Sequence, residues 1–332
     1  MIQYSFIVPV YNRPQEIQEL LESMTAVHFP RDFEIVIVED GSTVSSDKVV
    51  KEFEHILNIS YYKKENSGPG ASRNYGMQRA KGNYFIILDS DCLIPSNYLQ
   101  AADAFLKSNF VHCYGGPDAA HESFSPLQKA INYTMTSFFT TGGIRGGKKQ
   151  LQRFEPRSFN MGISKEAFIK TGGFGKIHPG EDPDLSQRLL KSGYETAFIP
   201  DAYVYHKRRI SWKKFYQQVR KFGLVRPILN KRHPSSAKIT FWFPSLFVIG
   251  VFVTLILSVL IHWYFLIPLG LYLVMILIDA SWKNKSIRIG IYSLFAVFIQ
   301  FFGYGIAFLQ SYWNIHVLNK DAAKAFPFLF FD

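Results

Sequence analysis

The sequence predicts an α/β fold, a mostly parallel sheet with flanking helices, followed by an α-helical membrane region. Short apolar runs alternate with segments of helical periodicity in the first part of the chain, which is typical of a parallel sheet. Beyond residue 238, long runs without charged residues dominate. Such runs are typical of membrane-spanning helices.

These patterns divide the chain into four segments. We expect an α/β catalytic domain over 1–205 and a basic amphipathic juxtamembrane segment over 206–238. About three transmembrane helices follow over 239–310, and an aromatic interfacial tail over 311–332. Residues 1–12 lack the basic start and long apolar core of a signal peptide.

The first elements follow one another in the order strand, helix, strand, helix. Strands are predicted over 6–10, 34–42 (ending in acid and glycine), 59–62 and 84–88, with helices after Arg13-Pro14, over 49–57 and over 71–80. This order predicts right-handed crossovers within one parallel sheet. A G-x-G-x-x-G motif does not follow the first strand, so a dinucleotide fingerprint is absent. Two cysteines, Cys92 and Cys113, stand at no metal-ligand spacing, which argues against a zinc site.

The apolar run 84–88 ends on Asp89-Ser90-Asp91. Open α/β sheets bind ligands at the carboxyl ends of such strands. Two carboxylates there can turn toward one Mg²⁺ or Mn²⁺, and such an ion often holds a substrate diphosphate. The alternative is a plain polar turn, since Asp and Ser favour turns.

Three further strand ends should lie at the same edge, at Tyr11-Asn12, Glu39-Asp40 and 66–70. A nucleotide could lie across them, with Asp40 accepting hydrogen bonds from a base or ribose. Arg73, near a helix start, could approach a phosphate. Alternatively, Asp40 belongs to a turn and Arg73 is a solvated helix residue.

The ordered motifs 8–12, 39–42, 70–76 and 89–91 resemble family 2 of the inverting glycosyltransferases, which have the GT-A (nucleotide-diphospho-sugar transferase) fold. The similarity covers roughly residues 3–210. It implies a hexosyltransferase that uses a UDP- or GDP-sugar with Mg²⁺ or Mn²⁺. The donor-binding residues implied are Pro9, Tyr11, Asn12, Asp40, Gly70, Arg73, Asn74, Asp89, Ser90 and Asn160.

The same resemblance implies that Glu181-Asp182 carries the general base, with Asp182 taking the proton. An acidic helix N-terminus is the alternative interpretation. It also implies that His206 is a further metal ligand beside Asp89 and Asp91, although a lone histidine is often structural.

Two basic stretches are candidates for acceptor or phosphate contacts. Within the irregular stretch 115–158, Arg145, Lys148 and Lys149 either grip a phosphate or belong to a solvated loop. Lys207, Arg208 and Arg209 either clamp a diphosphate or face lipid headgroups.

The net charge of +11 is carried by one region, because residues 206–239 hold eleven Lys and Arg and no acid. The interleaved aromatic and basic residues over 212–230 predict an amphipathic helix on a membrane surface. Within it, Gln217 and Arg220 resemble the Gln-x-x-Arg-Trp motif of processive synthases, but Lys221 stands in place of the tryptophan.

Membrane spans are predicted over 241–261, 264–278 and 289–309. The basic stretch 281–288 belongs in the cytoplasm by the positive-inside rule, so the first two helices form a hairpin and the third crosses outward. An interfacial third or tail helix is one alternative, and the core of a soluble helical domain is another. The prediction is therefore a multi-pass membrane protein with a cytoplasmic catalytic domain, in the inner membrane if bacterial.

The predicted function is sugar transfer to a lipid-linked or membrane-proximal acceptor, as in the synthesis of cell-envelope glycans. The alternatives are a polyprenyl-phosphate sugar synthase, a processive polysaccharide synthase and a non-catalytic membrane scaffold. Nucleic acid is not an expected partner, because the basic stretch directly precedes the apolar runs.

Overall fold

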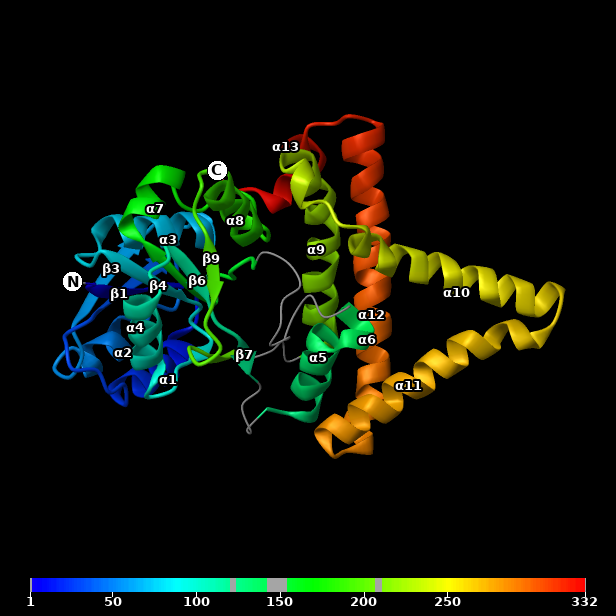
Figure 1. Cartoon of the computed structure of the whole chain (residues 1–332), viewed down its shortest axis with the longest axis horizontal. Helices are drawn as coiled ribbons and strands as arrows, with labels where there is room; N and C mark the ends of the chain where they lie inside the picture. The colour runs from blue at the N-terminus through cyan, green and yellow to red at the C-terminus, as the bar shows by residue number, and fades with distance from the viewer. Residues whose placement is uncertain (1, 120–123, 142–153, 207–210, 332) are drawn as a thin grey trace. The chain divides into compact units, whose positions relative to one another are not determined.

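A seven-stranded, mostly parallel sheet forms the centre of the first part of the chain in the computed structural model (Figure 1). The structure describes residues 2–119, 124–141, 154–206 and 211–331. The chain divides into two compact units: unit 1 contains 1–121, 148–206 and 330–332, and unit 2 contains 122–147 and 207–329.

The strand order of the large sheet is β3-β2-β1-β4-β8-β6-β9. Its strands are β1 (Tyr4–Val10), β2 (Glu34–Asp40), β3 (Ile59–Lys64), β4 (Tyr84–Leu88), β6 (Cys113–Gly115), β8 (Asn160–Ser164) and β9 (Thr196–Phe198). The first four strands are parallel, and β8 runs antiparallel to both of its neighbours. A second sheet, in the order β5-β10-β7, contains β5 (Cys92–Leu93), β10 (Val204–His206) and β7 (Asp118–Ala119). The predicted α/β class with a mostly parallel sheet is confirmed.

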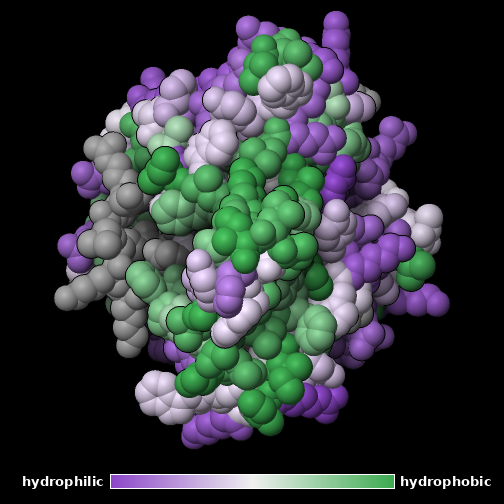
Figure 2. Space-filling model, turned by 90° about the vertical axis from the view of Figure 1, so that its right-hand side faces the viewer, coloured by the Kyte–Doolittle hydropathy of each residue, from purple (hydrophilic) through white to green (hydrophobic). Residues whose placement is uncertain are grey.

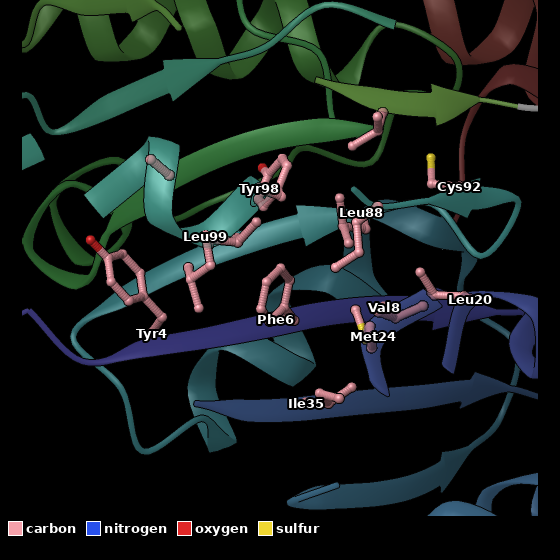
Figure 3. Packing of buried hydrophobic residues seen from close by; sticks show 14 of the residues in the cluster. Tyr4, Phe6, Val8, Leu20, Met24, Ile35, Leu88, Cys92, Tyr98 and Leu99 are labelled. Atoms are coloured by element: carbon pink, nitrogen blue, oxygen red, sulfur yellow. The ribbon is translucent and has the colours of Figure 1, made fainter. Parts of the chain in front are cut away.

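Helices cover both faces of the large sheet. In unit 1 they are α1 (Pro14–Thr25), α2 (Asp47–Phe53), α3 (Gly68–Arg79), α4 (Tyr98–Ser108), α7 (Lys165–Thr171) and α8 (Glu181–Lys191). One core cluster joins the sheet to α1 and α4, with Phe6, Val8, Leu20, Leu88 and Leu99 among its members (Figure 3). A second cluster on the opposite face joins the sheet to α3, α7 and α8. Because β1, β2 and β4 are buried on both faces, each contains a continuous apolar run, over 6–10, 35–38 and 84–88.

Unit 2 is helical. Its helices are α5 (Pro126–Thr136), α6 (Phe138–Thr141), α9 (Trp212–Arg232), α10 (Phe243–Leu260), α11 (Ile267–Asn284), α12 (Ile287–Tyr312) and α13 (Ala322–Ala325). Short 3-10 and π turns join them, over Pro234–Ser236, Ile239–Trp242, Trp263–Leu266, Trp313–Val317 and Pro327–Leu329.

The apolar stripe of α9 does not match its predicted position on a membrane surface. Phe215 and Val219 are buried against α5 and α12, in a cluster with Ile131, Met135 and Ala296. The periodicity of α9 was therefore that of a helix packed on other helices, since an apolar stripe does not specify what covers it.

Three helical segments are long and apolar enough to cross a membrane, Ile239–Leu260, Trp263–Asn284 and Ile287–Val317. Figure 2 looks toward the α10–α11 end of the chain and shows apolar side chains gathered in a broad band on that face. The segments differ in burial, because 11% of the most apolar window of each of the first two is buried, against 44% for the third. These segments indicate association with a membrane.

Candidate active site

Asn12 links the carboxyl ends of β1 and β2. Its backbone lies in the left-handed region (φ 53°), which Asn tolerates better than most residues. Its Oδ1 accepts hydrogen bonds from the backbone N–H groups of Thr43 (2.8 Å) and Val44 (2.9 Å). The loop after β2 is thereby held beside Tyr11, whose side chain is 51% exposed.

Asp40 lies at the end of β2 and is buried. The backbone N–H groups of Ser67 and Gly68 each donate to its carboxylate at 2.9 Å, and Lys64 forms an ion pair with it. A carboxylate in this position satisfies free N–H groups at the start of α3 and complements the helix dipole. Asp40 thus fixes the position at which α3 begins.

Helix α3 holds the segment that precedes α8. The side-chain amide of Asn74 donates to the carbonyl of Phe174 (2.9 Å) and accepts from its N–H (2.8 Å). Gly70 allows close approach, since a Cβ there would lie 2.9 Å from the carbonyl oxygen of Gly175. Two residues expected among the donor contacts therefore bind the segment that leads into Glu181.

Arg73 joins the two acidic sets of the site. Its guanidinium is buried, and it donates to Asp89 (Nη2 to Oδ1, 2.7 Å) and to Glu181 (Nη1 to Oε1, 3.0 Å). The three residues come from α3, the end of β4 and the start of α8. The alternative of a solvated Arg73 is excluded by its burial, because a buried guanidinium needs carboxylate partners.

Asp89 and Asp91 each have an arginine partner. Arg13 Nη1 donates to Asp91 Oδ2 at 2.9 Å, and the carboxylate of Asp91 raises the pKa of Arg13 although burial opposes this. Among the described residues, no three His, Cys, Asp or Glu side chains gather as a metal cluster. The hard carboxylate oxygens nevertheless suit Mg²⁺ or Mn²⁺. The backbone of His206 pairs with that of Cys92, the residue after Asp91, while its side chain lies outside the described part of the structure.

Helix α8 begins with two adjacent carboxylates whose pKa values move in opposite directions. Burial opposes ionisation of Glu181, but the charges of His178 and Arg73 outweigh it and lower the pKa of Glu181 to about 2. Burial and the neighbouring charge of Glu181 raise the pKa of Asp182, against the effects of Arg73 and Arg157. The buried Oδ1 of Asp182 receives no hydrogen bond from the residues that the structure describes. This carboxylate can accept a proton without first breaking a hydrogen bond at that oxygen.

Asn160 has a fully buried side chain. The hydroxyl of Tyr98 donates to its Oδ1 (2.6 Å), and its Nδ2 donates to the carbonyl of Ala202 (2.8 Å). These bonds join β8 to α4 and to the segment before β10. Pro9 lies within β1 and pairs with Val38. Such positions stabilise the sheet edge on which the site is built.

The remaining predicted contacts are placed as follows. Ser90, which stands between Asp89 and Asp91 in the sequence, is buried. Gln217 and Arg220 lie on α9 in unit 2, where the side chain of Gln217 is exposed. Arg145, Lys148, Lys149, Arg208 and Arg209 lie outside the described residues.

Three residues of the site were missed by sequence reasoning. Arg13 pairs with Asp91, and His178 Nδ1 lies 2.9 Å from Glu181 Oε1. Phe331 packs its ring against Gly68, at the start of α3, and against His178. His178 lies before Gly180, the N-cap of α8, so helical spacing did not predict its contact with Glu181. The other two contacts join distant parts of the chain.

A mostly parallel sheet, with one carboxylate set after β4 and a second at the start of α8, is typical of sugar transferases of the GT-A type. The chain belongs to glycosyl transferase family 2, whose model matches residues 5–172. It is similar to poly(ribitol-phosphate) beta-N-acetylglucosaminyltransferase TarS of Staphylococcus aureus, with 37% identity over 48% of this chain and 32% of that protein. It is also similar to minor teichoic acid biosynthesis protein GgaA of Bacillus subtilis, with 26% identity over 66% of this chain and 47% of that protein.

The chain thus spans about a third to half of the length of these relatives. Among solved structures, it shares its fold with mannosyltransferase PcManGT from Pyrobaculum calidifontis in complex with GDP-Man and Mn²⁺. The TM-score is 0.59 at 16% identity, over 94% of this chain and 88% of that one. The predicted family and the predicted GT-A fold are confirmed.

Proposed function

We propose that this protein is a membrane-associated inverting glycosyltransferase. It moves a hexose from a nucleotide-diphosphate sugar to a hydroxyl group of an acceptor held near the membrane. The observation that carries this proposal is the contrast between Glu181, whose charge is neutralised, and Asp182, whose pKa is raised and whose Oδ1 lacks a partner among the described residues. A general base needs a pKa brought toward the working pH and a lone pair that is not already engaged in a hydrogen bond.

Inversion requires one in-line displacement. The acceptor oxygen forms a bond to the anomeric carbon, and the bond from that carbon to the donor phosphate breaks. The electron pair of the broken bond leaves with the nucleoside diphosphate, and the acceptor proton passes to Asp182 Oδ1. Covalent capture by the enzyme is not required, so a single base suffices.

The leaving diphosphate belongs on the side of Asp89 and Asp91. A divalent cation held by Asp89, Asp91 and His206 would neutralise its developing charge. Arg73 forms ion pairs with both Asp89 and Glu181. One buried guanidinium therefore fixes the positions of the carboxylates on the leaving-group side and on the base side. Asp40 and Asn12 order the loops across which the nucleotide would lie.

The acceptor is proposed to be lipid-linked or membrane-proximal, because the transferase unit is followed by apolar helices. The names of TarS and GgaA favour a polyol-phosphate chain as one such acceptor. A polyprenyl phosphate and a growing polysaccharide are the rival acceptors, and the length of the product separates them. We place the catalytic unit in the cytoplasm, where nucleotide sugars are made.

The test is a donor screen with purified full-length protein and a panel of UDP-, GDP- and dTDP-sugars. Release of free nucleotide is measured with Mg²⁺, with Mn²⁺ and with a chelator, with and without membrane lipid extract. Asp182→Asn should reduce transfer by about 10²–10⁴-fold, the usual contribution of a general base, and leave donor affinity within a few-fold. Asp184→Asn, in the same helical turn, is the matched control. If Asp182→Asn turned over like the unaltered protein, the assignment of the base would be wrong.

A further inference from the structure

Residues 239–278, which include α10 and most of α11, contain no Asp, Glu, Lys or Arg. Large apolar side chains are exposed along both helices, among them Leu246, Ile256, Leu271 and Ile278. Water does not stabilise such a surface, and its extent exceeds the scattered apolar residues usual on soluble proteins. A covering of lipid is the occupant that fits a charge-free surface of this length.

The chain returns to unit 1 after these helices. Phe330 forms a β-bridge with Ile177, and the N–H of Phe331 donates to the carbonyl of Lys176 at 3.1 Å. The ring of Phe331 fills the space beside Gly68, where a Cβ would lie 2.4 Å from it. Residues 330–331 therefore belong to the same folded unit as the chain before residue 207.

This return constrains the number of membrane crossings. A folded unit lies on one side of a membrane, so the chain between residues 207 and 329 must cross an even number of times. Three crossings, as the apolar runs alone predict, would place residues 330–331 on the side opposite to Ile177. At least one of the three candidate segments therefore does not cross.

Helix α12 is the segment that contacts a charged helix along its length. Trp212 and Tyr292 are in ring contact at one end (centroids 6.0 Å apart), and Ser311 Oγ donates to the carbonyl of Leu224 (2.6 Å) further along. At the other end, Lys231 Nζ donates to the carbonyl of Ile315 (2.8 Å).

Helix α9 carries seven basic residues and no acidic one, namely Lys213, Lys214, Arg220, Lys221, Arg226, Lys231 and Arg232. If α12 crossed the hydrocarbon, α9 would enter it too, with Arg220 and Lys221 near its middle. Charged side chains at that depth are costly unless they are paired or reach water. The seven charges therefore exclude α12 as the crossing helix.

We propose that α10 and α11 form a membrane hairpin that enters the lipid bilayer and returns, while α12 stays with α9 on the side of the catalytic unit. Each hairpin helix has 18 residues, about 27 Å at 1.5 Å per residue, close to the ~30 Å of a bilayer core. The turn between them carries Trp263 and Tyr264, residue types that favour the membrane interface. Lys238, Lys283 and Lys285 flank the open end, where they can meet anionic headgroups. This inference does not depend on the proposed transferase mechanism.

Labelling of single introduced cysteines tests the topology. The native Cys92 and Cys113 are buried, so the unaltered full-length protein is the unlabelled background. Ala323→Cys reports on the chain after α12, and Lys51→Cys, in α2 of unit 1, marks the catalytic side. Sealed vesicles of each orientation are treated with a membrane-impermeant maleimide.

We expect both cysteines to react in the same vesicle orientation and both to be protected in the other. Reaction of Cys at 323 only in the orientation that protects Cys at 51 would overturn the proposal, because α12 would then cross. A second measurement compares matched pairs of exposed isoleucines.

The double variant Ile249→Asp with Ile256→Asp, on α10, should abolish the fraction of the protein that stays with the membranes after washing with alkaline carbonate. Ile291→Asp with Ile306→Asp, on α12, should leave it within twofold of the unaltered protein. These four side chains have similar exposure, between 43% and 55%. Loss caused by the α12 pair, with retention by the α10 pair, would contradict the assignment of the hairpin.

Discussion

The two acidic sets of the site differ in how completely their charge is compensated. After β4, Asp89 pairs with Arg73 and Asp91 pairs with Arg13. At the start of α8, Glu181 pairs with Arg73 and His178, whereas Asp182 keeps a buried Oδ1 without a hydrogen bond from the described residues. The difference shows how one fold can pair several carboxylates with cations and raise the pKa of a neighbouring one.

The largest expected change in stability follows from removing the link between the sets. Arg73→Met leaves Asp89 and the buried Glu181 without their shared cation, and breaking such a buried pair costs about 3–5 kcal/mol. Thermal or denaturant unfolding of the full chain in detergent measures it. The stability of Arg73→Lys should lie between those of the unaltered protein and Arg73→Met. A single ammonium keeps the positive charge but does not reproduce the forked contact of the guanidinium with two carboxylates. An unchanged unfolding midpoint in Arg73→Met would contradict the importance of this link.

A smaller loss of stability is expected when α3 is pushed away from the segment that leads into Glu181 and Asp182. Gly70→Ala places a Cβ 2.9 Å from the carbonyl oxygen of Gly175, and overpacking of this kind costs about 1–3 kcal/mol. Transfer should fall together with stability, because α3 positions α8. Gly250→Ala, where a Cβ meets nothing within 4 Å, is the control. If the two variants behaved alike, close approach of α3 to the 174–175 segment would not matter.

A weaker effect still is expected at the other arginine. The side chain of Arg13 is 36% exposed, so its ion pair with Asp91 is screened by water. Arg13→Gln should change the free energy of unfolding by only about 0–1 kcal/mol. Comparison with Arg73→Met in the same unfolding experiment separates a buried linker from a surface partner. A loss of stability in Arg13→Gln as large as that in Arg73→Met would show that the Arg13–Asp91 pair is not a weak surface pair.

The smallest expected effect is a displacement of the pH profile. The raised pKa of Asp182 means that the base is protonated, and activity lost, as pH falls through a value above the 3.8 of an ordinary aspartate. Glu181→Gln removes a neighbouring negative charge, so it should lower the pKa of Asp182 and move the acid limb of kcat/KM to lower pH. Glu195→Gln, at an exposed position, should not move that limb. Movement to higher pH in Glu181→Gln would refute the coupling.

The secondary structure of the sheet was largely predictable from sequence. The run 84–88 is continuous and apolar because β4 is buried on both faces, and its position was confirmed. Helix α3 starts three residues earlier than predicted, at Gly68, because Asp40 caps N–H groups that a local pattern does not show as paired. Short strands such as β5 and β6 were missed, since two or three residues carry no recognisable period.

The hydrogen bonds and ion pairs that connect the residues of the site were not predictable from sequence. Arg73 and Glu181 are 108 residues apart in sequence, so no local pattern indicates that they meet. Asn74 was expected to contact the donor, yet both ends of its amide bind the backbone of Phe174. Polar side chains in a motif identify the region of a site, but their partners are chosen by the folded chain.

By itself, the sequence determined the α/β class, the family motifs, the carboxylates at the strand ends and the charge-free stretch 239–278, because these depend on local composition and spacing. Only the tertiary structure decided that Asp182 Oδ1 is buried without a hydrogen bond from the described residues, and that Phe330 and Phe331 return to unit 1. Both depend on contacts between residues far apart in the chain. Apolar runs can be counted in a sequence. The number of them that cross a membrane depends on which folded unit the chain joins after the last run, and that is decided by contacts between distant residues.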